Sequence, residues 1–109
     1  MTRSLIRKSP EDEALESIRS AFSAVESHLA KAEAKEIRSY LKQGESGLAF
    51  EMLLEHFQEK GLPLPSKASA PLKKAGKMMM YDRGDPDEVS YWEMLEGLSS
   101  VAQSVPISS

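Results

Sequence analysis

Large apolar residues recur every three or four positions along most of the chain, which is the spacing of one face of an α-helix. The first run begins after Ser9 and Pro10, which suit the N-cap and the first position of a helix. The run weakens over residues 30–34, resumes, and stops at Gly44. We therefore expect a helix from residue 10, an irregularity near residues 30–34, and a second helical stretch that ends at Gly44. The apolar residues of the first run are Leu15, Ile18, Phe22, Val25 and Leu29.

The strongest helical pattern lies between Gly44 and Gly61, where a C-terminal glycine and the following prolines end the run. Three of its glutamates, Glu51, Glu55 and Glu59, are four positions apart and form one acidic ridge, whereas lysines usually alternate with glutamates on a structural helix. The ridge therefore favours a role in binding. The apolar face consists of Leu48, Met52, Leu53, Phe57 and Leu62, widened by Phe50 and Leu54.

Two shorter helices are predicted in the remainder of the chain. The first occupies residues 66–81, with Ser69 as the preferred N-cap and Pro71 in the first turn. It ends in three methionines, Met78–Met80, which we expect in the core rather than on a flexible binding surface. The second begins with a capping box formed by Asp85 and Glu88. Its apolar face consists of Val89, Trp92, Leu95 and Leu98.

No segment alternates apolar and polar residues with the period of two that marks a strand. The prediction is an all-α fold, a compact bundle of four or five short helices. The 109 residues form a single domain, in which residues 1–8 and 100–109 are expected to be frayed tails. Within the bundle we expect four side chains to be buried, namely Phe22, Leu53, Phe57 and Leu95.

Composition narrows the possible chemistry. The chain has no cysteine and two histidines, His28 and His56, so thiolate chemistry and a histidine-rich metal cluster are excluded, which leaves only carboxylates as potential metal ligands. A phosphate-binding loop is not present either, and the acidic residues alone define no catalytic pair. We therefore expect a binding protein rather than an enzyme, without a metal or a cofactor. No apolar stretch is long enough to cross a membrane or act as a secretory signal, so the expected location is cytoplasmic.

The formal net charge of −3 argues against direct binding of nucleic acid. Charge is also segregated along the chain: residues 44–62 are acidic, residues 63–80 carry four lysines and no acid, and residues 81–109 carry six acids against one arginine. Two interpretations remain open. The segments could attract one another inside the fold, or the acidic segments could form one face that steers a basic partner.

A short motif links the second and third predicted helices to a known family. Gly-Glu is followed by Leu-Ala-x-Glu-x-Leu at residues 44–53, and the helix then closes before a proline-containing loop. This pattern resembles that of small bacterial immunity proteins, the Maf-type antidotes and those of contact-dependent growth inhibition, over residues 36–80. The matching residues are Gly44, Glu45, Leu48, Ala49, Glu51 and Leu53, and we expect them to serve the fold.

The resemblance implies tight binding to one cognate toxin domain inside the producing cell. Many such toxins are nucleases with basic surfaces, which an acidic partner would fit. The hypothesis therefore places the toxin contact on exposed acids, with two aromatic residues as candidate anchors, although Trp92 is also a plausible core residue. The proposed contact residues are Glu55, Glu59, Asp82, Asp85, Asp87, Glu88, Tyr91 and Trp92.

Two other functions remain as alternatives. The chain could be a helical adaptor or a regulatory subunit in a larger protein complex, with no toxin involved. A more distant alternative is an RNA-associated protein that uses the lysines of residues 67–77.

Overall fold

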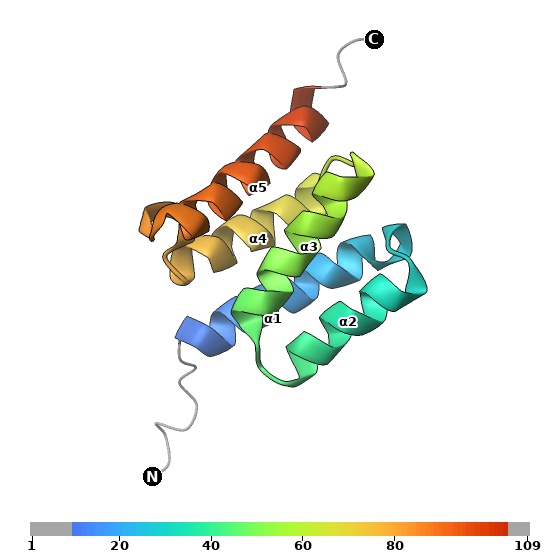
Figure 1. Ribbon diagram of the computed structural model, residues 1–109, viewed down its shortest axis with the longest axis horizontal. Coiled ribbons are helices and arrows are strands. Elements are labelled where there is room, and N and C mark those ends of the chain that lie inside the picture. Colours follow the sequence, from blue (N-terminus) through green and yellow to red (C-terminus); the bar gives the residue numbers. More distant parts are fainter. Residues whose placement is uncertain (1–9, 105–109) are drawn as a thin grey trace.

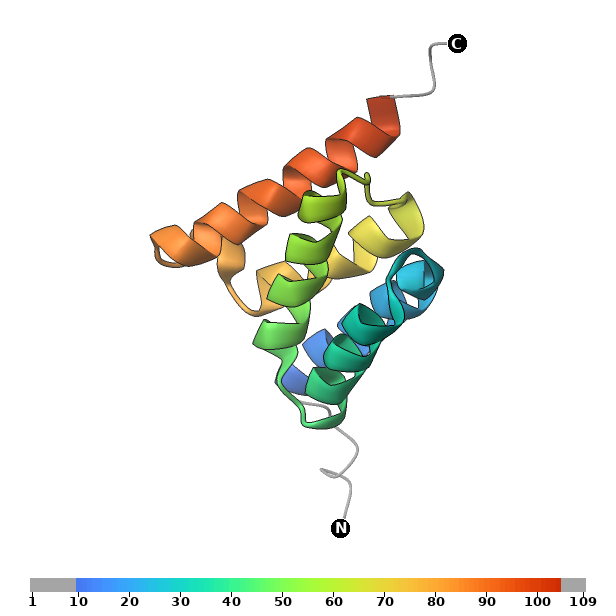
Figure 2. The same ribbon diagram turned by 45° about the vertical axis from the view of Figure 1, so that its right-hand side comes forward.

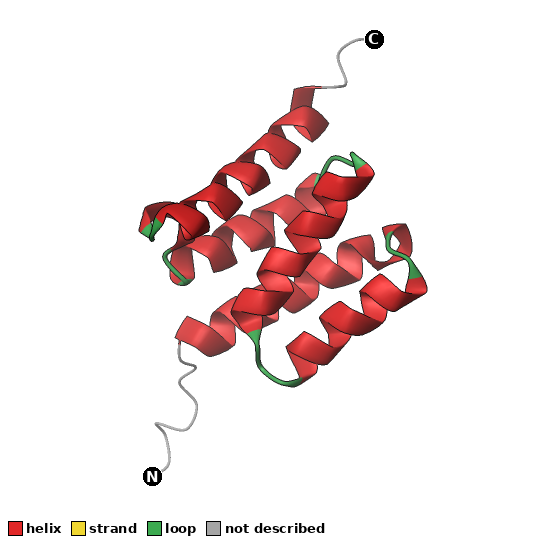
Figure 3. Ribbon diagram, in the orientation of Figure 1, coloured by secondary structure: helices red, strands yellow, loops and turns green. Residues whose placement is uncertain are grey.

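The computed structural model describes residues 10–104, and all regular structure there is helical, without a strand (Figures 1 and 3). The predicted all-α fold is therefore confirmed. In the described residues, no helix is both long enough and apolar enough to span a membrane. The elements are α1 (Pro10–Val25), the 3₁₀ turn η2 (Glu26–His28), α2 (Lys31–Lys42), α3 (Ser46–Lys60), α4 (Ser66–Met78), the 3₁₀ turn η3 (Tyr81–Arg83) and α5 (Pro86–Ser104).

Helix α3 lies in the middle of the bundle, with α2 on one side and α5 on the other (Figures 1 and 2). Helix α1 packs most extensively on α4, which comes much later in the chain, and α4 in turn contacts α5. The core fills the space between these helices. The four side chains predicted to be buried, Phe22, Leu53, Phe57 and Leu95, are at most 6% exposed, so this prediction is confirmed.

The predicted ends of α2 and α3 are confirmed by backbone geometry. Gly44 follows α2 with φ +77°, and Gly61 follows α3 with φ +66°. Both angles are in the left-handed region, where glycine carries no penalty for a side chain. The capping box of α5 is also present: the Glu88 N–H donates to Asp85 Oδ1 at 2.9 Å, and the Asp85 N–H donates to Glu88 Oε1 at 3.1 Å.

The break after the first helix lies earlier than expected. Helix α1 ends at Val25, η2 follows, and Ala30 is extended, so α2 already begins at Lys31. The Ala30 N–H donates to the Glu33 carboxylate at 2.9 Å, and this bond supplies an N-terminal cap that the alanine side chain could not. Residues 31–34 thus form the first turn of a helix, and the irregularity covers residues 26–30, which overlaps the expected stretch only at Ala30.

Two expectations about α4 and α5 are wrong. Helix α4 begins at Ser66, because Pro65 adopts the extended cap conformation and accepts the first N–H groups, while Ser69 is buried inside the helix. Pro71 therefore lies within α4, where it removes one helical hydrogen bond. Helix α5 continues to Ser104, past the expected start of a tail at residue 100. The predicted N-cap Ser9, the predicted tail 1–8 and residues 105–109 of the predicted tail 100–109 lie outside the described residues.

Two apolar residues lie at the surface instead of in the core. Leu48, expected on the buried face of α3, is 43% exposed. Met80, expected in the core with Met78 and Met79, is 58% exposed, whereas its two neighbours are half-buried. The reason at Met80 is that α4 has already ended, so the methionine lies in the turn between α4 and η3.

Candidate acidic binding site

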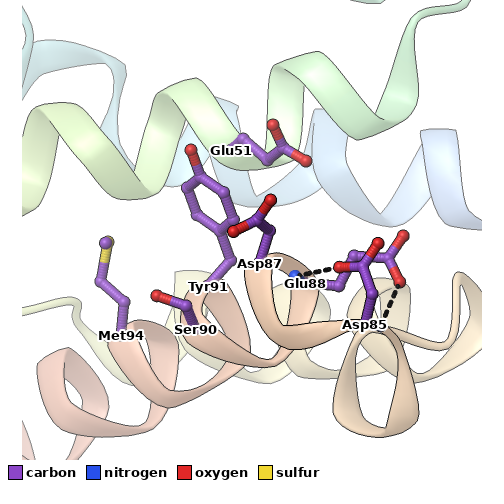
Figure 4. Close-up of a pocket in the computed structure, with 7 residues that line it drawn as sticks. All are labelled: Glu51, Asp85, Asp87, Glu88, Ser90, Tyr91 and Met94. Carbon is purple, nitrogen blue, oxygen red and sulfur yellow. Dashed lines mark hydrogen bonds between the residues drawn. The ribbon is translucent and has the colours of Figure 1, made fainter.

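A groove between α3 and the first turns of α5 gathers three of the six acids proposed for binding, Asp85, Asp87 and Glu88 (Figure 4). Its volume is about 530 Å³. We call it the acidic groove and define it by its lining residues, Glu51, Asp85, Asp87, Glu88, Ser90, Tyr91 and Met94.

The lining residues come from two short stretches with helical spacing. Asp87, Ser90, Tyr91 and Met94 are three or four positions apart, so they share the face of α5 that is turned toward α3 (Figure 4). Glu51 extends from α3 on the opposite wall. Asp85 and Glu88 stand at the N-terminus of α5, where negative charge stabilises the helix dipole and where the capping box fixes both side chains.

Two tyrosine hydroxyls bind carboxylates of α3. The Tyr81 hydroxyl donates to Glu51 Oε2 at 2.5 Å, and the Tyr91 hydroxyl donates to Glu55. Burial and the hydrogen bond to Glu51 raise the pKa of Tyr81 well above its usual range. The hydrogen bond to Glu55, together with burial, raises the pKa of Tyr91 to about 12. Both tyrosines thus remain neutral donors over the physiological range and hold two carboxylates in place.

The carboxylates of the groove have no cationic partner within the part of the chain that the structure describes. Glu51 accepts a hydrogen bond from Tyr81, and Asp85 and Glu88 accept hydrogen bonds from backbone N–H groups. Acids elsewhere do pair with cations: Glu33 is 2.9 Å from Lys60 Nζ, and Glu26 contacts Arg38. Because the negative charge of the groove is not neutralised by a neighbouring side chain, its field extends into solvent.

The second polar cluster joins α2 to α3 and lies outside the groove. His56 Nε2 is 3.2 Å from Glu36 Oε1, and its Nδ1 is 3.5 Å from Glu33 Oε2. The hydrogen bond from Lys60, followed by that from the Ala30 N–H, lowers the pKa of Glu33. These contacts connect two packed helices, which is a structural role. Among the described residues, no three His, Asp or Glu side chains are arranged to hold a metal ion.

The structure brings five of the eight proposed contact residues together. Asp85, Asp87, Glu88 and Tyr91 line the groove, and Glu55 adjoins it through its bond with Tyr91. The other three residues do not line it: Glu59 is exposed one turn beyond Glu55, Asp82 lies in η3 beside Arg83 at 3.3 Å, and Trp92 packs elsewhere.

Trp92 packs toward α4. A Cβ placed on Gly76 would lie 2.8 Å from the indole ring, so the tryptophan rests directly on the α4 backbone. It is half-buried and packed against the core. This geometry favours the interpretation of Trp92 as a core residue over that of a binding anchor.

The motif residues have different environments. Gly44 forms the turn, Ala49 and Leu53 are buried, and Leu48 is exposed. Glu45 precedes α3 and caps it without a side-chain hydrogen bond. Glu51, expected to serve the fold, does accept the Tyr81 hydroxyl, but it also lines the groove.

Sequence reasoning missed Ser90 and Met94 as lining residues. Their spacing relative to Asp87 and Tyr91 would have identified them once that face of α5 was chosen.

Comparisons with protein-family models, characterised proteins and solved structures find no match for the chain. The acidic groove and the motif at residues 44–53 are therefore the two features of the chain that bear on its function.

Proposed function

We propose that this chain is an immunity protein that binds and neutralises a cognate toxin domain, a basic nuclease, through the acidic groove. The observation that carries the proposal is the groove itself: four carboxylates from α3 and α5 share one surface without a lysine or arginine partner among the described residues. Lysine and arginine side chains of a partner would supply the missing counter-charges.

A nuclease must hold phosphates and therefore presents a basic surface. An acidic inhibitor is attracted to that surface at long range, which raises the association rate. The hydrogen bonds from Tyr81 and Tyr91 fix Glu51 and Glu55 before binding, so less side-chain entropy is lost in the complex. The proposal is one of binding in the cytoplasm, without catalysis, metal or cofactor.

The motif at residues 44–53 supports the same assignment through its resemblance to immunity proteins. Its parts have separate roles in the proposal: Gly44 and Leu53 build α3, whereas Glu51 contributes a carboxylate to the groove.

Growth rescue tests the proposal. The toxin domain encoded next to the gene for this chain would be expressed in a bacterial host with and without the chain. We expect the toxin domain to stop growth and the chain to restore it. Asp87→Lys should weaken rescue, because it reverses a charge in the groove. Glu96→Lys makes the same change on an exposed residue of α5 outside the groove and should preserve rescue.

Other outcomes assign the chain differently. If no neighbouring toxin exists, or if the chain does not restore growth, the immunity assignment is wrong. Purification of the chain in a fixed ratio with a multi-subunit complex would instead support the adaptor alternative. Equal rescue by Asp87→Lys and Glu96→Lys would support the immunity function but show that the acidic groove is not the surface that binds the toxin.

A further inference from the structure

Two large apolar side chains, Leu48 and Met80, are exposed in the described part of the chain. Single exposed apolar residues are common and carry no meaning by themselves. The backbone conformation at Met80 and the contacts made by the sequence neighbours of both residues distinguish this pair.

Met80 occupies the position after a helix C-cap that usually belongs to glycine. Its φ is +65° and its ψ is +27°, and it is the one non-glycine residue with positive φ among the described residues. Helices α2 and α3 end with Gly44 and Gly61 in the same conformation, so the chain uses glycine for this turn elsewhere. A side chain in this region costs about 1 kcal/mol. Packing does not offset that cost, because the methionine side chain is mostly exposed.

Tyr81 connects Met80 to the start of α3. Its hydroxyl lies 3.3 Å from the point where a Gly47 Cβ would be, and it donates to Glu51 in the groove. Leu48 directly follows Gly47, and Met80 directly precedes Tyr81. Each of the two exposed apolar residues is therefore the sequence neighbour of a residue in this contact, and Leu48 lies one turn before Glu51, which lines the acidic groove.

We infer that Leu48 and Met80 are apolar anchors for an amphipathic basic helix of the partner, whose lysines or arginines face the acidic groove. The inference rests on the proposed function, since it concerns the same surface. Charge complementarity selects the occupant: unpaired carboxylates repel nucleic acid and anionic membranes but attract a cationic segment. Methionine suits such a contact because its flexible side chain adapts to an apolar partner face.

Peptide binding measured by fluorescence anisotropy tests the inference on the full chain. The probe is a labelled amphipathic helical peptide of leucine and lysine. The comparison peptide has the same length and charge, with serine in place of leucine. We expect the leucine-containing peptide to bind about tenfold more tightly, which is the effect of a well-placed apolar anchor.

Substitutions at Met80 separate the anchor from the turn. Met80→Asn keeps a residue that tolerates the left-handed conformation and should lose about tenfold in affinity for the leucine-containing peptide. Met80→Leu keeps an apolar side chain and should retain binding. Leu48→Ser should weaken binding in the same way as Met80→Asn, and thermal unfolding should show that each variant is folded.

Equal affinity for the two peptides, or parent-like binding by Met80→Asn and Leu48→Ser, would overturn the inference. This failure is distinct from failure of the proposed function, which growth rescue decides. If growth rescue does not depend on Met80, the acidic groove remains the proposed toxin-binding site, but Leu48 and Met80 are not anchors. If peptide binding depends on Met80 but the chain does not rescue growth, Leu48 and Met80 are anchors for a partner other than a toxin.

Discussion

At the scale of single residues, the groove depends on hydrogen bonds between side chains that are far apart in sequence. Tyr81 and Glu51 are 30 positions apart, and Tyr91 and Glu55 are 36 apart. Local patterns predicted the buried positions of Phe22 and Leu53, because helical spacing alone defines a buried face. The same patterns could not pair the tyrosines with glutamates, because those pairs depend on how α3 meets η3 and α5.

The Tyr91–Glu55 hydrogen bond predicts a specific alkaline titration. Tyr91 should ionise near pH 12 in the folded chain, against 10.0 for an ordinary tyrosine. The raised pKa means that the unfolded chain loses this proton first. Its contribution to stability is therefore complete below about pH 10 and is lost as the pH rises through 12. The difference in phenolate absorbance between the parent chain and Tyr91→Phe isolates this group.

Glutamine substitutions supply the control for this titration. Glu55→Gln removes the charge that opposes the phenolate, so the pKa of Tyr91 should fall toward 10.0. Glu59→Gln lies one turn farther along α3 and should leave the titration unchanged. An ordinary pKa for Tyr91 in the parent chain would show that the hydrogen bond to Glu55 does not form in solution.

At the scale of helices, boundaries set by glycine were predictable and the boundary set by packing was not. Gly44 and Gly61 end their helices through a local conformational preference. Ser69 has the sequence features of an N-cap, but it is buried within α4, and the extended Pro65 takes the capping position four residues before it. The preference of one serine was thus overridden by an additional turn of helix that buries Ala68.

The contact between α4 and α5 predicts the effect of an alanine at Gly76. Its Cβ would lie 2.8 Å from the Trp92 ring and 3.2 Å from Phe50. Both rings belong to the packed interior, so one of them must move. We expect Gly76→Ala to lower the free energy of unfolding by about 1–3 kcal/mol, as overpacked cores do. Urea denaturation measures this change.

Gly97→Ala is the matched control, because Gly97 is also helical and nothing lies within 4 Å of its would-be Cβ. This substitution should raise the free energy of unfolding by about 0.5–1 kcal/mol through backbone entropy. If Gly76→Ala stabilises the chain as much as Gly97→Ala does, Trp92 does not pack on α4 as described.

At the scale of the whole molecule, the lysine-rich segment and the acidic groove have different surroundings. Glu13, Glu16 and Lys74 line one groove between α1 and α4, so part of the lysine-rich segment lies against acids of the same fold. The acidic groove lies between α3 and α5 and has no such neighbour. Sequence reasoning could list the acids of this groove, but only the packing of α5 against α3 separates Asp87 from Glu96.

Under the proposed function, the charge distribution predicts how the association rate with the toxin domain depends on salt. Because screening shortens the range of the field to about 10 Å at 0.1 M salt, association should slow as salt is added, while dissociation changes less. Asp87→Lys should reduce the association rate more than Glu96→Lys, although both change the net charge equally. Stopped-flow mixing at two salt concentrations measures both rates. An association rate that is independent of salt would exclude steering by the groove.

The pairing of α1 with α4 has a consequence for how the chain is made. Helix α1 leaves the ribosome before the other described helices, but its most extensive partner is the segment Ser66–Met78, which is synthesised only after α2 and α3. The apolar face of α1 therefore lacks its main partner until α4 has been synthesised. The loop that this contact closes spans roughly half of the chain. The backbone bond from the Leu64 N–H to the Leu98 carbonyl forms later still. A nascent chain interrupted after α3 would hold the motif of residues 44–53 without a closed core, so this motif could adopt its native packing only after α4 has been synthesised.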